Sequence, residues 1–96
     1  MIVFDFDKAT RQIRELRQIA DDMSAMSSQK LGAAVSCVET SWKGRTGQLF
    51  LEKCADIESR IKKEAACLRS LADRFESTAR SIEEAERQAE AAAADL

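Results

Sequence analysis

Three cysteines, Cys37, Cys54 and Cys67, are the side chains of this sequence that could carry thiol or metal chemistry. Their number is odd, and their spacings match neither a Cys-x-x-Cys pair nor a zinc-binding pattern. The 96-residue chain contains no His, so it offers no imidazole base, no Cys-His pair and no His ligand for a metal. We therefore interpret the cysteines as small buried hydrophobic residues with free thiols, and we expect no catalytic residues, no metal and no cofactor. A redox protein built on the three thiols is the alternative.

The composition fits a single soluble domain. Hydrophobic residues make up 45% of the chain, and 15 Lys plus Arg against 17 Asp plus Glu leave a net charge of −2. Nucleic-acid-binding proteins usually carry a basic face, whereas the charges here are nearly balanced, so we expect no nucleic-acid partner. We also expect no small-molecule substrate. The chain has no apolar run long enough to span a bilayer, and its first residues lack the basic and apolar regions of a Sec signal peptide.

Hydrophobic periodicity predicts two long helices. The chain has no Pro and only three Gly, and apolar residues recur every three or four positions over about 8–40 and again over about 47–94. Asp5 and Asp7 precede the first stretch and suit a helix N-cap. The segment 41–46 contains Gly44 between hydroxyl residues and predicts a short turn, which places the helices antiparallel. We therefore predict an all-α fold in which residues 1–96 form a single helical hairpin.

The second helix carries a heptad seam of apolar residues. Small residues, among them Ala65, Ala72 and Ala79, are expected to flank this seam, and two polar residues interrupt it. The predicted seam consists of Phe50, Cys54, Ile57, Ile61, Glu64, Leu68, Leu71, Phe75, Thr78, Ile82, Ala85 and Ala89.

The apolar residues of the first helix sweep roughly half of its circumference, which is more than contact with one helix covers. We therefore expect the hairpin to pair into a four-helix bundle, either with a second copy or with a different hairpin. The residues expected to bind this partner are Leu16, Ile19, Met23, Met26, Ile61, Leu68, Phe75 and Ile82. The acidic end of the chain, residues 83–96, is either a solvated helical tail or a docking segment.

A Trp-x-Gly motif lies at the predicted turn. Trp42 is followed two residues later by Gly44, and Phe50 comes eight residues after the Trp. A large aromatic residue at a helix–helix corner can plug the open end of a hairpin. Gly44 allows the backbone to turn tightly or to take a positive φ, and Phe50 then begins the seam of the second helix.

With this motif in the middle of a two-helix chain of this length, the sequence resembles the WXG family, the ESAT-like small proteins of type VII secretion. The resemblance covers nearly the whole chain and also includes the opening residues Ile2, Val3 and Asp5. It implies a hairpin that forms homodimers or heterodimers and is exported by, or escorts cargo to, a membrane ATPase translocase. Such proteins are not enzymes.

The sequence departs from the family pattern in its export signal. Many members carry Tyr-x-x-x-Asp/Glu near the end of the second helix, but this chain has no Tyr, and the segment beginning at Phe75 lacks the acid. The resemblance therefore implies a targeting partner or chaperone of a larger secreted effector such as an LXG toxin, or a substrate itself, cytoplasmic before export and then secreted or at the cell surface. The alternative is a cytoplasmic coiled-coil adaptor whose Trp-x-Gly is accidental.

Overall fold

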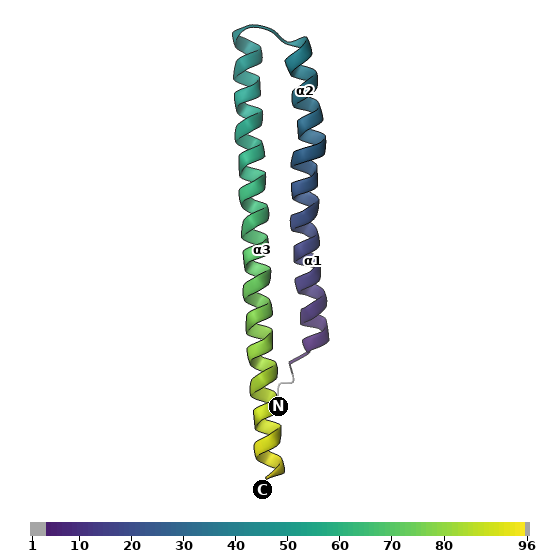
Figure 1. Ribbon diagram of the computed structural model, residues 1–96, viewed down its shortest axis with the longest axis vertical. Helices are drawn as coiled ribbons and strands as arrows, with labels where there is room; N and C mark the ends of the chain where they lie inside the picture. The colour runs from purple at the N-terminus through teal and green to yellow at the C-terminus, as the bar shows by residue number, and fades with distance from the viewer. Residues whose placement is uncertain (1–3, 96) are drawn as a thin grey trace.

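A computed structural model describes residues 4–95, which form one helical hairpin (Figure 1). The first arm runs through α1 (Phe6–Ala25), the π-helical segment η1 (Met26–Leu31) and α2 (Gly32–Ser41). After the connecting residues 42–44, α3 (Arg45–Ala94) returns antiparallel beside it. The predicted all-helical hairpin is thus confirmed, and its helices begin and end within two residues of the expected bounds. Ile2 and Val3, which contributed to the resemblance, lie outside the described residues.

The first arm begins at a capped N-terminus. The side chain of Asp5 accepts a hydrogen bond of 3.0 Å from the backbone N–H of Lys8, which satisfies one of the free donors of the first turn. Asp7 adds a negative charge beside the positive end of the helix dipole. The roles expected for these two aspartates are therefore confirmed, and together they explain why the helix starts at Phe6.

Two arginines show the register of the two arms. Arg17 of α1 contacts Asp73 of α3 at 3.0 Å, and Arg69 of α3 contacts Asp21 of α1 at 3.1 Å. The turn of α1 that contains Arg17 and Asp21 therefore lies level with the turn of α3 that contains Arg69 and Asp73.

Small side chains form the centre of the contact between the arms. Ala20 and Ala72 lie within the two level turns, and both are completely buried. The same spacing of seven residues repeats along both arms. Its buried members are Ile13, Ala20 and Ser27 on the first arm, and Ala65, Ala72 and Ala79 on α3. We call this contact the alanine seam. Because the distance between packed helices depends on the side chains at the contact, the alanine seam allows the two backbones to approach closely.

The observed seam corrects the one predicted for the second helix. The alanines expected beside the seam form its centre, and large apolar residues expected within it project to one side. The exposed fraction is 41% for Phe50, 49% for Ile57 and 48% for Phe75, whereas Cys54 is buried as expected. Periodicity locates the apolar stripe of a helix, but it does not tell which edge of that stripe meets the other arm. Here the edge with small side chains does.

A π-helical turn shifts the contact within the first arm. Continued seven-residue spacing after Ser27 would bring Ala34 to the seam, but Ala34 is exposed and Val35 is half-buried. A π turn accommodates one extra residue, so η1 exchanges Ala34 for the larger Val35 at the contact. Within this turn Ser27 is completely buried, and its hydroxyl has no hydrogen-bond partner among residues 4–95.

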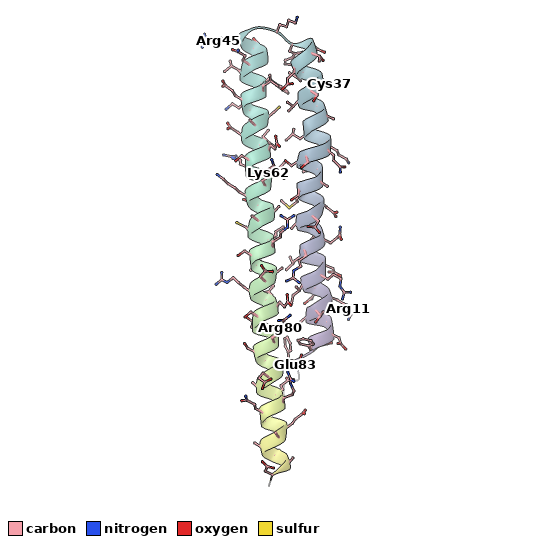
Figure 2. All side chains as sticks on the ribbon, in the orientation of Figure 1. Arg11, Cys37, Arg45, Lys62, Arg80 and Glu83 are labelled. Atoms are coloured by element: carbon pink, nitrogen blue, oxygen red, sulfur yellow. The ribbon has the colours of Figure 1, made fainter. Side chains whose placement is uncertain are left out.

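The molecule is a rod with extents of 79 × 16 × 16 Å. Helix α3 has 50 residues and extends past the start of the first arm, as its predicted length required (Figure 1). Arg45 lies at the closed tip of the hairpin, and Glu83 lies near the open end (Figure 2).

Candidate functional site

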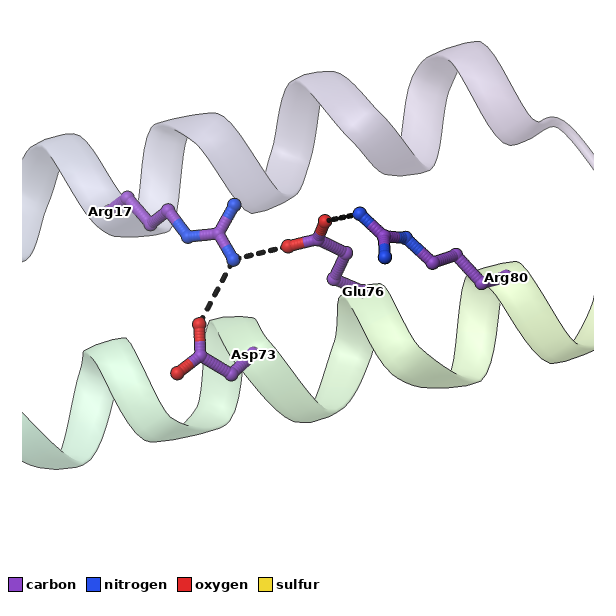
Figure 3. A network of polar contacts seen from close by, with 4 residues as sticks. All are labelled: Arg17, Asp73, Glu76 and Arg80. Carbon is purple, nitrogen blue, oxygen red and sulfur yellow. Dashed lines mark hydrogen bonds and ion pairs between the residues drawn. The ribbon is translucent and has the colours of Figure 1, made fainter.

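The two sides of the alanine seam differ in chemistry, and one side is lined by charged groups. Figure 3 shows Arg17 between Asp73 and Glu76, and Glu76 also accepts a hydrogen bond from Arg80. The hydrogen bond from Arg17, together with the positive charges of Arg17 and Arg80, holds the pKa of Glu76 below its ordinary value. These groups link the two arms along one side of the hairpin.

A second polar cluster continues the same side toward the tip. Arg69 of α3 donates hydrogen bonds of 3.1 Å to Asp21 and 3.0 Å to Ser24 of the first arm. Sequence reasoning did not find these contacts, because their partners are 45 to 48 residues apart and no local spacing relates them. Their chemistry is structural: each charge is matched within the hairpin, although several of the groups on this side also line open grooves beside the seam.

The opposite side of the seam is apolar and open. Near the open end of the hairpin it contains a groove of about 470 Å³. Leu16 and Ile19 line this groove from α1, and Phe75 and Ile82 line it from α3. Ile19 and Phe75 each remain about half exposed. The structure therefore brings four of the expected partner-binding residues together from both arms.

The other four expected residues extend the same surface toward the tip. Met23 and Met26 follow Ile19 at helical spacing on the first arm, and Ile61 and Leu68 precede Phe75 by whole heptads on α3. Further apolar residues on α3 widen it. We define the apolar face as these eight residues together with Phe50, Ile57 and Leu71. Of its members, Ile19, Met26, Phe50, Ile57, Leu71 and Phe75 are exposed, and Leu16, Met23, Ile61, Leu68 and Ile82 are half-buried.

Two polar residues of α3 interrupt the apolar face, and Gln12 and Glu15 of α1 also line its groove. Glu64 lies seven residues after Ile57 and seven before Leu71, so it occupies the same edge of α3, and it is exposed. Thr78 lines the groove beside Phe75. Unlike the carboxylates on the polar side, Glu64 forms no ion pair with any Lys or Arg in residues 4–95.

The Trp-x-Gly motif shapes the tip of the hairpin. Trp42 packs on Phe50 with ring centroids 5.0 Å apart and a tilt of 49°. Gly44 has φ 86° and ψ −166°, a conformation that is essentially restricted to Gly. The positive φ expected at this position is therefore confirmed. Trp42 is 49% exposed, however, and therefore rests on the outside of the tip instead of plugging it. Half of the indole is available for a further contact.

Gly47 is a tip residue whose role sequence reasoning missed. A Cβ atom at this position would lie 3.0 Å from the carbonyl oxygen of Trp42, so the first turn of α3 packs directly on the connecting backbone. The available signal was its position three residues after Gly44, at the start of the second predicted helix.

The cysteines form no common site. All three are free, which confirms the prediction of three free thiols. Cys54 is buried in the seam, but Cys37 and Cys67 are exposed, so the interpretation as buried residues is wrong for these two. Both are off the small-residue edge that the hairpin buries. Within residues 4–95, no three or more Cys, Asp and Glu side chains gather in a group that could hold a metal ion.

Comparisons with known proteins provide no relative from which a function could be transferred. No family model, curated protein or solved structure matches the chain. Among residues 4–95, no helix combines the length and the apolar character needed to cross a membrane. The apolar face is therefore the candidate site on the strength of its own geometry.

Proposed function

We propose that this chain is a non-enzymatic partner protein of type VII secretion. It pairs along its apolar face with another helical protein, forms a four-helix bundle with it, and targets that protein for export. The proposal joins two separate supports: the resemblance carried by Trp42, Gly44 and Phe50, and a hairpin with one apolar side. The effector that it accompanies, such as an LXG toxin, contacts the secretion ATPase as part of the complex.

The observation that carries the proposal is the uncovered apolar face. Covering apolar surface contributes about 25 cal/mol for each Å² removed from water, and contiguous apolar patches on soluble proteins mark sites of interaction. Ile19 on the first arm and Phe75 on α3 are half exposed on the same side of the rod. A second pair of helices laid along this side covers residues from both arms at once, which is the geometry of a four-helix bundle.

The test is a charge placed on the apolar face outside the alanine seam. In Ile19→Glu, the hairpin should remain helical, because Ile19 is 49% exposed. Partner binding should be lost, because pairing would bury an unpaired carboxylate. Ala25→Glu introduces the same charge at an exposed position on another side of α1 and serves as the control. Circular dichroism measures folding, and co-purification of tagged protein from its own host measures pairing.

Secretion assays separate this function from a general coiled-coil adaptor. Export of the native chain should require both the translocase ATPase and the paired protein, since the chain lacks a Tyr-x-x-x-Asp/Glu signal. Normal co-purification of Ile19→Glu, or efficient secretion from a host deleted for every candidate partner, would contradict the proposal. Pairing that persists without any dependence of either protein on the translocase would favour the adaptor.

A further inference from the structure

Glu64 is an acidic side chain within the apolar face. It shares an edge of α3 with Ile57 and Leu71, and the half-buried Ile61 and Leu68 lie one turn to either side of it. Arg60 is four residues earlier, but it forms no ion pair with Glu64. Arg followed by Glu is the less favourable order for an ion pair at this spacing. Among residues 4–95 no charged side chain balances the carboxylate, so this exposed group is solvated by water.

A protein that covers the apolar face must replace this water. Burying an ionised carboxylate without a partner is strongly unfavourable. In coiled coils, a single polar residue in an apolar seam specifies the register and the oligomer state, and charged residues beside the seam set the choice of partner. A matching protein therefore needs a positively charged side chain opposite Glu64, in addition to its apolar residues.

A second copy of this chain does not meet that requirement when it is antiparallel. On α3 the apolar face runs from Phe50 to Ile82, so its midpoint is residue 66. Full antiparallel overlap of two copies sets residue 64 opposite residue 68, which brings the two Glu64 side chains within about 6 Å along the helix axis. Like charges at a forming interface oppose association.

A parallel second copy brings together like-charged ends. Lys43 and Arg45 make the tip basic, while the open end of α3 is acidic and matched only in part by Arg87. The acidic residues there are Glu83, Glu84, Glu86, Glu90 and Asp95. In a parallel pair, tip would lie on tip and acidic end on acidic end. The parallel arrangement is therefore opposed by charge at both ends. The antiparallel arrangement sets each basic tip beside an acidic end and is opposed at its centre, by the two Glu64 side chains.

We propose that Glu64 makes the apolar face select a different helical protein, one that presents a Lys or Arg side chain opposite Glu64. This inference rests on the proposed function, because it concerns the partner of the same face. It adds the chemistry of that partner and assigns Glu64 as the residue that discriminates against self-pairing.

The test uses purified protein and a charge-reversed copy as the basic partner. Wild type and Glu64→Lys should each be monomeric at a concentration at which their equimolar mixture forms a 1:1 dimer. The dissociation constant of the mixed dimer, measured by analytical ultracentrifugation, should be at least about tenfold lower than that of either protein alone, and should rise with salt. Glu64→Leu, which removes the charge, should self-associate more tightly than wild type.

Glu52→Lys is the matched control, because Glu52 is exposed on the same helix about 120° around the axis from Glu64. Its mixture with wild type should associate no more tightly than wild type alone. A wild-type homodimer as tight as the mixed dimer, or a Glu64→Lys mixture no tighter than the Glu52→Lys mixture, would overturn the inference. These measurements do not depend on export. They can therefore fail while the secretion and co-purification tests succeed, and they can succeed while those tests fail.

Discussion

Glu76 receives hydrogen bonds from an arginine on each arm, and this makes the hairpin sensitive to acid. Its pKa is lowered first by the hydrogen bond from Arg17 and then by the charges of Arg17 and Arg80. A carboxyl whose pKa is lower in the folded chain contributes stability above its unfolded pKa. That contribution is lost as the pH falls through the folded pKa, because the unfolded state then binds more protons.

We expect Arg17→Gln to weaken this dependence. The free energy of unfolding of wild type should fall on acidification below about pH 5, where glutamates begin to titrate. The fall should be shallower in Arg17→Gln, because the main cause of the lowered pKa of Glu76 is gone. Urea unfolding at a series of pH values measures the difference. Arg11→Gln, at an exposed position outside the network, should behave as wild type; equal slopes in all three proteins would contradict the assignment.

At the scale of the helices, the closeness of the two arms depends on the alanine seam. Ala20 and Ala72 are both completely buried, and the residues one heptad away on each arm are buried too. A larger side chain here must displace a whole helix and not a single neighbour. The seam therefore constrains residue size more strictly than the apolar face beside it.

Ala72→Leu should destabilise the hairpin by roughly 1–3 kcal/mol, the usual cost of overpacking a filled core. Leucine is nearly as good a helix former as alanine, so the loss reports packing between the arms. Ala66→Leu, at an exposed position on α3, is the control and should change stability by less than about 0.5 kcal/mol. Thermal and urea unfolding followed by circular dichroism compare the two variants. Similar stability for both would show that the alanine seam is not tightly packed.

Across the whole molecule, packing is concentrated in one half of the rod. The fully buried residues Ala20, Ser27, Ala65 and Ala72 all lie where α1 and η1 meet α3. Helix α2 has no buried residue, although it lies beside α3. Beyond Glu83, every described residue of α3 is exposed.

This distribution predicts a gradient of amide hydrogen exchange. Amides over 65–79 should exchange most slowly, those of α2 faster, and those over 88–95 fastest, because local opening is easiest where few apolar contacts are lost. Native-state exchange followed by mass spectrometry measures protection segment by segment. Equal protection along α3 would mean that the hairpin opens only as a unit, against the expectation from burial.

Much of the fold could be predicted from the sequence, because its signals are local. Periodicity, the absence of Pro, the capping Asp5 and the positive-φ Gly44 each act within a few residues, and they led to the helices, the turn and the hairpin. The composition of the candidate site was also predictable in part: Ile19 and Phe75 belong to apolar stripes that are visible in the chain alone.

Only the tertiary structure decided which edge of each stripe is buried and which side of the hairpin remains apolar. That choice depends on the distance between the two helices. This distance depends in turn on the side chains buried between them, such as those of Ala20 on the first arm and Ala72 on α3. The partners of Arg17 are 56 and 59 residues away from it along the chain. No local pattern relates such residues, so the polar side, the alanine seam and the half-exposed Trp42 emerged only when the arms were packed together.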